Sequence, residues 1–410
     1  MKKKCIISID IGSESIKIFS GFTYEDDTYT ITDNIIAPVE GFSKGELTDI
    51  DALCHSIRQA LDCTSLTTEL INNGVVFLGI DGSFLTRNTT TGEVALSSPD
   101  KITEADIKKA YKAAKLSCIP EDQEVLYISH AENLSQKVIS SPQDGLKVLT
   151  HIISIDKKIL ETLKIGFLKN KIKIDNIVIK SIAGATAAIL NLEDQKQDFL
   201  FIDVGAGSTE IALISDGCIK TTNSIPLGGI YITNDIKTSI DVDFFHAEAI
   251  NRYYSKLDKN LYGQNIILDC NNDNTKDKLI NYDLLHNIIQ SRTEEIIALI
   301  HDYVITNIYN NDENLYKKIN IVLAGGCANS NSLNELLAEA FECDIKKIDL
   351  KDLSKEYNSP QNACCYGIFQ LAKNKFPFED AGNNKKSPQN FSRFLENISK
   401  KIFKQEDQHA

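Results

Sequence analysis

The sequence predicts an α/β protein built from two related halves, because one short pattern of strand, tight turn and strand occurs twice. An apolar strand over residues 5–9 runs into Asp10-Ile11-Gly12, and another over residues 199–202 runs into Asp203-Val204-Gly205. Each Asp-x-Gly turn is followed by a second apolar run, which is typical of a β-hairpin. A further apolar strand, residues 321–324, ends in paired glycines. Each half is therefore expected to supply one loop of small residues.

The segments between these strands add helices and an insertion. Apolar residues have helical spacing within 50–72 and again within 331–341, and a short buried strand is expected over 75–80. Residues 82–163 have strand patterns and an amphipathic helix pattern of their own, including Ile107, Ala110 and Ala114. This stretch is therefore expected to form an inserted subdomain.

The overall composition limits the classes of function. The 410 residues exceed what one small core needs, so more than one domain is expected. A formal net charge of −13 argues against a broad surface for nucleic acid. No apolar stretch is long enough to span a membrane, and Asp10 and Glu14 interrupt the basic start, so no secretory signal is expected. The ten cysteines form no Cys-x-x-Cys pair, which predicts reduced thiols in a cytosolic protein.

The two Asp-x-Gly turns are suited to binding phosphate. Glycine lets the backbone approach a ligand closely, and successive amides in such a turn point at an anion. Hydroxyl donors would be added by four residues of the turns, namely Ser13, Ser15, Ser208 and Thr209. Two such loops that face each other would clasp the phosphates of a nucleotide.

The leading carboxylates and a nearby lysine extend this prediction. Asp10 and Asp203 would be positioned for Mg²⁺, through its water shell, and Lys17 would neutralise phosphate charge. One Asp-x-Gly turn alone is common, but two copies and the strand that ends in Gly325-Gly326 favour nucleotide binding. The sequence contains neither a P-loop nor a Rossmann fingerprint.

Three segments resemble motifs of a known superfamily. Residues 10–17, 203–210 and 323–326 resemble the phosphate-1, phosphate-2 and adenosine motifs of the actin, heat-shock chaperone and sugar-kinase ATPases. Within that superfamily the chain resembles the FtsA family of bacterial cell-division proteins over nearly its whole length. For example, residues 224–229 resemble that family's Pro-Val-Gly-Gly segment.

The resemblance implies that the nucleotide is ATP. It also implies that Glu248 and Arg252, one helical turn apart, contact the ribose and adenine, although a solvated pair on a helix accounts for them equally well. The nucleotide-binding residues expected from the turns and the resemblance together are Gly12, Ser13, Glu14, Ser15, Lys17, Gly205, Ala206, Gly207, Ser208, Thr209, Gly229, Glu248, Arg252, Gly325 and Gly326.

The implied fold has two actin-like, ribonuclease H-like α/β domains around a nucleotide cleft, an inserted subdomain of the type called 1C, and a C-terminal amphipathic helix. The expected boundaries are 1–81 and 164–195 for subdomain 1A, 82–163 for 1C, 196–250 and 318–372 for 2A, 251–317 for 2B, 373–389 for a linker and 390–404 for the helix.

The sequence departs from the family pattern at two places. Ala206 adds a methyl group in the second phosphate loop, where the backbone is expected to need positive φ. Lys180 stands where the family usually has a carboxylate. Since no general base is identifiable either, these changes predict at most a weak ATPase.

The C-terminal segment predicts a helix that binds membranes. Five apolar residues recur with helical spacing, namely Phe391, Phe394, Leu395, Ile398 and Ile402. Three lysines lie off that face, namely Lys400, Lys401 and Lys404. A basic amphipathic helix behind a flexible linker is typical of an anchor on anionic lipid. The alternative is a helix that docks on its own globular body.

Three functions are compatible with these features. The first, implied by the resemblance to FtsA, is a self-associating adaptor at the division site, peripheral on the cytoplasmic face of the cell membrane. It would tether the tubulin-like division protein FtsZ there and help to recruit the division machinery. The second is a pilus-assembly protein of the PilM type, which shares the fold but needs no anchor of its own. The third is a sugar kinase or exopolyphosphatase, which requires a catalytic carboxylate that the sequence does not offer.

Overall fold

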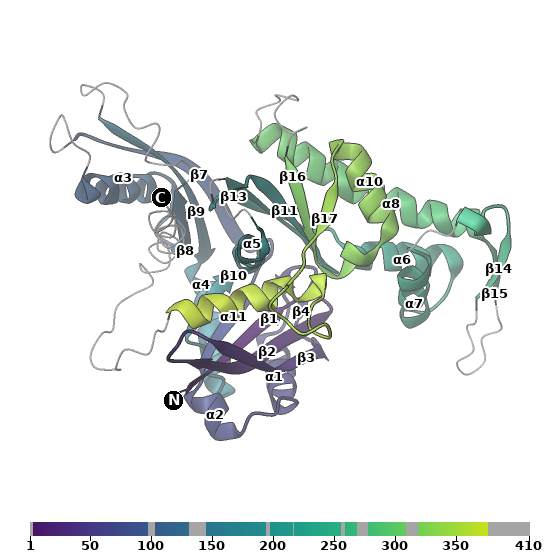
Figure 1. The fold of residues 1–410 in the computed structure, drawn as a ribbon, viewed down its shortest axis with the longest axis horizontal. Coiled ribbons are helices and arrows are strands. Elements are labelled where there is room, and N and C mark those ends of the chain that lie inside the picture. Colours follow the sequence, from purple (N-terminus) through teal and green to yellow (C-terminus); the bar gives the residue numbers. More distant parts are fainter. Residues whose placement is uncertain are drawn as a thin grey trace.

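The computed structural model describes residues 3–96, 103–130, 145–193, 197–215, 217–255, 259–268, 278–308 and 319–375. These residues form two five-stranded mixed sheets with helices packed on them, and a three-stranded sheet beside them (Figure 1). A two-stranded hairpin of β4 (Phe42–Ser43) and β5 (Glu46–Leu47) completes the first part of the chain.

The first mixed sheet is formed mainly by the N-terminal part of the chain. Its strand order is β10-β6-β1-β2-β3, in which β1 pairs antiparallel with β2 and parallel with β6. Strands β1 and β6 are buried almost throughout because apolar residues continue along both of them. The strand bounds are β1 Lys3–Ile11, β2 Ser15–Tyr24, β3 Tyr29–Pro38, β6 Val75–Ile80 and β10 Asn176–Ile179.

The second mixed sheet repeats the first in order and direction. Its order is β13-β12-β11-β16-β17, in which β11 pairs antiparallel with β12 and parallel with β16. The bounds are β11 Phe199–Val204, β12 Thr209–Ser215, β13 Cys218–Ile225, β16 Asn320–Ala324 and β17 Ile345–Lys347. The prediction of two related α/β halves, each with a hairpin at its Asp-x-Gly turn, is therefore confirmed.

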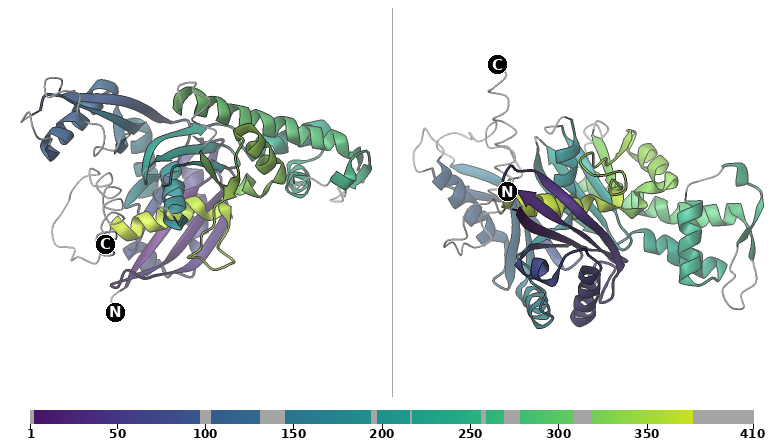
Figure 2. Two further views of the ribbon diagram at one scale, coloured as in Figure 1. Left: turned by 45° about the horizontal axis from the view of Figure 1, so that its top comes forward. Right: turned by 60° about the horizontal axis from the view of Figure 1, so that its bottom comes forward.

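Two helices lie between the sheets and join them. Helix α5 (Lys180–Asn191) packs on β11, β12 and β13 of the second sheet, whereas α11 (Ala363–Lys375) packs on β1, β2 and β6 of the first. The two helices also contact each other (Figures 1 and 2). Their approach is close because Gly367 of α11 has no side chain: a Cβ atom there would overlap the Ala183 carbonyl oxygen of α5.

The other face of the second sheet carries a separate hydrophobic core. Helices α6 (Gly229–Ile240), α8 (Tyr282–Tyr303) and α10 (Asn331–Phe341) contribute apolar side chains to this core, and α7 (Phe244–Tyr254) packs on α6. The remaining elements of this region are β14 Asn265–Leu268, β15 Lys278–Asn281, η1 Lys259–Leu261, η2 Val304–Ile308, η3 Gly326–Asn329 and η4 Pro360–Asn362.

The three-stranded sheet falls within the stretch that was expected to be inserted. It consists of β7 (Leu85–Val94), β9 (Leu146–Asp156) and β8 (Gln123–His130), paired antiparallel in that order. Helix α3 (Glu104–Cys118) packs on β7 and β9, and α4 (Lys157–Lys169) follows β9 and packs on α1.

The helical pattern over 50–72 corresponds to two helices instead of one. Helix α1 (Ile50–Asp62) ends at Cys63, and α2 (Thr68–Asn73) starts after Thr67, whose side chain accepts a hydrogen bond from the Leu70 amide. The break occurs just after Thr64, which donates its amide and its hydroxyl back to the Leu61 carbonyl of α1. Ser65 instead donates both its amide and its hydroxyl to Asp33, outside the helix.

A buried histidine links the three-stranded sheet to the second mixed sheet. Nε2 of His151, on β9, accepts a hydrogen bond from the Thr222 amide of β13 at 3.2 Å, and Nδ1 lies 3.1 Å from the Thr89 hydroxyl. Burial, and then the nearby Arg87 charge, lowers the pKa of His151 to about 3 from its ordinary value of 6.5. The imidazole is therefore neutral in the folded protein.

This histidine predicts a loss of stability in mild acid. Between its folded and unfolded pKa values the unfolded chain binds a proton that the folded chain does not, so stability falls as the pH falls below about 6.5. From pH 7.5 to pH 5 the loss should be about 2 kcal/mol, at about 1.4 kcal/mol per pKa unit. Urea denaturation at both pH values would measure it, with His151→Gln as the neutral control. An equal pH dependence in the two proteins would contradict the prediction.

Candidate functional site

The two Asp-x-Gly turns are closed by the same backbone hydrogen bond. The Gly12 amide donates to the Ser15 carbonyl at 3.0 Å, and the Gly205 amide donates to the Ser208 carbonyl at 3.0 Å. Each turn closes a hairpin at the end of a buried central strand, β1 in one sheet and β11 in the other. The sequence repeat thus produces two equivalent loops.

The structure brings these two loops into contact. A Cβ atom added at Gly207 would overlap the Ser13 side chain, and it would lie 2.9 Å from the Lys44 Cα atom. Glycine is required here for close approach and not for a special φ angle, because neither Gly205 nor Gly207 has positive φ. The prediction that the loops of the two halves face each other agrees with this geometry.

A third loop joins them at the tip of the β4–β5 hairpin. The Gly45 amide donates to Ser13 Oγ at 3.0 Å, and both Lys44 and Gly45 have positive φ, at 51° and 75°. The Lys44 ammonium lies 5.3 Å from the ring centre of Tyr231, on α6 of the other half. Sequence reasoning missed this cation. The Ser43-Lys44-Gly45 turn was the available signal, but nothing local connects it to the distant loops.

Asp10 is buried and flanked by two lysines. Lys180 Nζ lies 2.8 Å from Asp10 Oδ1 and donates to the Ile11 carbonyl at 3.1 Å, while Lys17 Nζ lies 3.6 Å from Asp10 Oδ2. Burial alone would raise the pKa of Asp10, but the two ammonium groups lower it below its ordinary value. The carboxylate is therefore charged and compensated within the protein.

Asp203 has different neighbours. Its Oδ2 atom accepts a hydrogen bond from the Cys364 thiol at 3.0 Å, and a Cβ atom at Gly325 would overlap its Oδ1 atom. Burial raises the pKa of Asp203, and the Lys180 charge opposes that rise. Gly325 has a φ of 93° and packs against Asp203, so the turn after β16 lies directly beside the second Asp-x-Gly turn. A Cβ atom on Gly326 would meet no atom within 4 Å, so this glycine borders open space.

The surroundings of Asp10 do not fit the Mg²⁺ ion that the sequence led us to expect beside it, bound through its water shell. Mg²⁺ takes carboxylate and water oxygens in near-octahedral geometry, whereas both oxygens of Asp10 face ammonium groups. A divalent cation beside Lys17 and Lys180 would be repelled by both. Within the described parts of the chain, no group of three or more His, Cys, Asp or Glu side chains is arranged to hold a metal ion.

The start of α6 holds the second phosphate loop in place. The Gly229 amide donates to the Gly205 carbonyl at 3.0 Å, and the Ile230 amide donates to the Ala206 carbonyl at 2.8 Å. A Cβ atom at Gly228 would collide with the same two carbonyls. The expectation that Ala206 needs positive φ is wrong, because Ala206 is not among the residues with positive φ. Its methyl group therefore causes no backbone strain.

Two of the expected hydroxyl donors have partners inside the protein. Thr209 is fully buried and donates to the Leu227 carbonyl at 2.8 Å, and Ser208 donates to Glu210 Oε1 at 2.8 Å. These hydroxyls shape the loop, because each one fixes the end of β12 to a neighbouring residue. Neither hydroxyl proton therefore points at a ligand in this structure.

A buried charged cluster lies behind the loops. Arg87 forms an ion pair with Asp81 and lies 4.0 Å from Glu210 of the second half. Burial, and then the Asp81 charge, raises the pKa of Glu210 well above its ordinary value. Sequence reasoning missed this cluster, although Asp81-Gly82 directly follows the buried strand β6 and so places a carboxylate at the end of a strand.

Glu14 and Arg252 form an ion pair between the two halves. Arg252 Nη2, on α7, lies 3.0 Å from Glu14 Oε1 in the first loop and also contacts Glu248 on its own helix. Burial and the neighbouring Glu248 raise the pKa of Glu14. The structure therefore brings all three of these predicted residues together. They lie at the side of the loops where Arg252 is 72% exposed.

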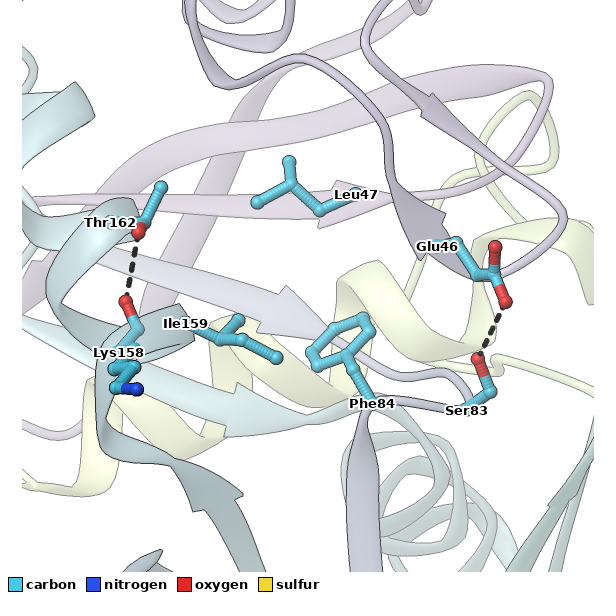
Figure 3. A pocket seen from close by; sticks show the side chains of 7 residues that line it. All are labelled: Glu46, Leu47, Ser83, Phe84, Lys158, Ile159 and Thr162. Atoms are coloured by element: carbon cyan, nitrogen blue, oxygen red, sulfur yellow. Dashed lines mark hydrogen bonds between the residues drawn. The ribbon is translucent and has the colours of Figure 1, made fainter. Parts of the chain in front are cut away.

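A separate shallow cavity lies close to the third loop. It has a volume of about 470 Å³ and is lined by Glu46, Leu47, Ser83, Phe84, Lys158, Ile159 and Thr162 (Figure 3). Apolar side chains from the β4–β5 hairpin and from α4 face each other across it, and none of the predicted nucleotide-binding residues lines it. It is therefore a different site.

The predicted membrane-binding residues lie outside the described part of the chain, which ends at residue 375. They are Phe391, Phe394, Leu395, Ile398, Lys400, Lys401, Ile402 and Lys404. Among the residues that are described, no helix has both the length and the apolar character needed to cross a bilayer.

Sequence comparisons identify cell division proteins among the relatives of this chain. A family model described as cell division protein FtsA matches residues 200–367. The cell division protein FtsA of Bacillus subtilis is 28% identical over 72% of this chain and 68% of its own length. That of Neisseria meningitidis serogroup B is 26% identical over 90% of this chain and 91% of its own length.

Structural comparisons show the actin-like fold. The PilM–PilN type IV pilus biogenesis complex contains a chain that matches with a TM-score of 0.66 at 14% identity, covering 90% of this chain and 98% of its own. MreB5 of Spiroplasma citri, bound to the ATP analogue AMPPNP, matches with a TM-score of 0.51 at 15% identity, covering 90% of this chain and 95% of its own. The same protein bound to ADP gives a TM-score of 0.52. At these identities the likeness shows the fold alone.

Proposed function

Because the chain is a homologue of the FtsA cell division proteins, within the actin-like ATPase superfamily, we propose that it is an ATP-binding adaptor of the division machinery. In this proposal it self-associates into filaments and tethers an FtsZ-type tubulin homologue to the cytoplasmic face of the cell membrane at the division site. From there it helps to recruit further division proteins.

One observation carries the nucleotide part of the proposal. Two hairpin turns with the same hydrogen bond, one from each related half, touch each other through Ser13 and Gly207. Successive backbone amides in turns of this kind are suited to phosphate groups. Actin-like neighbours with the same fold bind adenine nucleotides, as the MreB5 structures with AMPPNP and ADP illustrate.

The proposed nucleotide site consists of the two Asp-x-Gly turns, the Gly325-Gly326 turn and the residues beside them. The backbone amides that follow Gly12 and Gly205 in the two turns, with the Lys17 ammonium, would hold the phosphates, since the amides of the two glycines close the turns themselves. Gly229, Gly325 and Gly326, with Glu248 and Arg252 on α7, would border the nucleoside. We expect ATP turnover to be slow, because Lys180, where the family usually has a carboxylate, lies beside Asp10, and the sequence identifies no general base.

The sequence of residues 390–404 supports the membrane part of the proposal. Its apolar face would enter the boundary between lipid headgroups and acyl chains, while its lysines attract anionic lipid. This attraction has to come from the tail, because the chain as a whole carries a net charge of −13. A pilus-type protein of the same fold would not need such a tail.

Co-sedimentation with anionic vesicles tests the adaptor. The full chain with ATP should bind the vesicles and carry an FtsZ-type protein with it, whereas a chain that lacks residues 387–410 should do neither. Phe394→Glu should weaken binding about tenfold or more, since burying a large apolar side chain is worth about 1.5–3 kcal/mol. Asn397→Glu, which adds the same charge off the apolar face, is the matched control. Vesicle binding that is indifferent to both Phe394→Glu and salt would contradict the anchor and favour the pilus-type alternative.

A further inference from the structure

The position of Lys180 bears on how the proposed site would hold a nucleotide, beyond its expected effect on turnover. Lys180 is the first residue of α5, directly after β10, and its side chain is only 15% exposed. Its ammonium lies 2.8 Å from Asp10 Oδ1 and donates to the Ile11 carbonyl, so it is held at the end of β1 in the first phosphate hairpin. Its charge acts on the aspartates of both hairpins: it lowers the pKa of Asp10 and opposes the rise in the pKa of Asp203.

This lysine stays charged where it lies. Burial alone would lower the pKa of Lys180, but the carboxylates of Asp10 and Asp203 raise it above its ordinary value. A buried ion pair is costly to break, because removing one partner leaves the other charge uncompensated. The ammonium is thus a permanent cation at the place where the two halves meet.

We infer that Lys180 supplies, from within the chain, the positive charge that a divalent cation would otherwise bring between Asp10 and Asp203, so that the site binds nucleotide without needing Mg²⁺. This inference rests on the nucleotide binding proposed above. Lys17 and Lys180 both lie beside Asp10, so two ammonium groups already occupy the side of this carboxylate where a divalent cation would otherwise bind.

The competing possibility is that a Mg²⁺–nucleotide complex displaces the lysine from Asp10. That displacement would have to break the 2.8 Å ion pair and also the hydrogen bond to Ile11, and it would leave the ammonium beside the metal. It predicts strongly Mg²⁺-dependent binding, which is the opposite of the behaviour inferred here.

The test measures ATP affinity by displacement of a fluorescent ATP analogue from the full chain, in excess Mg²⁺ and in excess EDTA. The wild-type affinities in the two buffers should agree within about threefold, since ordered charge-assisted contacts to the chain's own lysines remain in both. Lys180→Glu should bind tenfold or more weakly in EDTA than in Mg²⁺, about the effect of one charged contact. Lys180→Arg, which keeps the charge, should retain the wild-type behaviour.

Two further arms make the result decisive. Lys173→Glu makes the same charge change at a lysine paired with Asp175 outside the site, and should not alter the dependence on Mg²⁺. Lys180→Gln removes the charge without reversing it, and it replaces Lys180→Glu in the test if the glutamate variant folds poorly. Its ATP affinity should also be lower in EDTA than in Mg²⁺, by a smaller factor than for Lys180→Glu. Wild-type binding that falls about tenfold or more in EDTA overturns this inference alone. Failure to bind ATP in either buffer overturns the proposed nucleotide function, and this inference with it.

Discussion

Replacing Gly207 by valine should weaken ATP binding by more than about 100-fold. The new side chain has no room, because even its Cβ atom would overlap Ser13 and press on the Lys44 backbone. The two phosphate loops would be forced apart, and one of them would lose its amide contacts to the nucleotide. Hydrogen bonds to charged groups are worth about 1.5–3 kcal/mol each, so losing two costs about 3 kcal/mol or more.

Isothermal titration calorimetry with ATP would measure this loss, with circular dichroism to show that the variant is folded. Gly166→Val is the matched control, because it creates a similar collision with the Ile50 side chain in α1, away from the loops. It should keep the wild-type affinity. A folded Gly207→Val protein that binds ATP as tightly as the wild type would contradict the placement of the nucleotide between the loops.

The second large effect should come from Gly367, at the contact between α5 and α11. Alanine in place of glycine within a helix normally stabilises a protein by up to about 1 kcal/mol. Here the added methyl group would overlap the Ala183 carbonyl oxygen, a backbone atom that moves only if a whole helix moves. We therefore expect Gly367→Ala to lower the free energy of unfolding by about 3 kcal/mol, near the upper end of overpacking effects.

Urea denaturation would measure this change, and Gly326→Ala provides the comparison. That substitution adds the same methyl group where no atom lies within 4 Å, so it should change stability by less than about 0.5 kcal/mol. Because α5 and α11 join the two mixed sheets, Gly367→Ala should also broaden the unfolding transition if the sheets then unfold separately. A neutral or stabilising Gly367→Ala would show that the helices separate without cost.

The elements that the sequence predicted best are those specified by neighbouring residues. An apolar strand, an Asp-x-Gly turn and a second strand follow one another within about fifteen residues, so the hairpins of β1–β2 and β11–β12 were expected from local pattern alone. The strand order of each sheet agrees with the inference from repetition. Nothing in the structure bears on the predicted membrane residues, which lie beyond its described part.

The parts that sequence reasoning missed depend on residues far apart in the chain. Lys44 reaches the loops only because the β4–β5 hairpin folds over Ser13, and Cys364 meets Asp203 across 161 positions. Polar residues such as Arg87 and Glu210 carry no periodic signal that would indicate their pairing. The substitution at Lys180 was noticed in the sequence, but its ion pair with Asp10 depends on how β10 and α5 dock against β1.

The two turns share one closing hydrogen bond, and this similarity affects how a ligand between them would be oriented. If two turns with the same hydrogen bond alone held a polyphosphate chain, they would give it little preference for one direction over the other, because similar donors would lie at both ends. The direction must come from what differs around the turns. Asp10 lies among ammonium groups, whereas Asp203 lies against the neutral Cys364 thiol and the Gly325 backbone. The more highly charged end of the ligand should therefore lie toward the first half of the molecule, so the polarity of binding comes from residues outside the repeat.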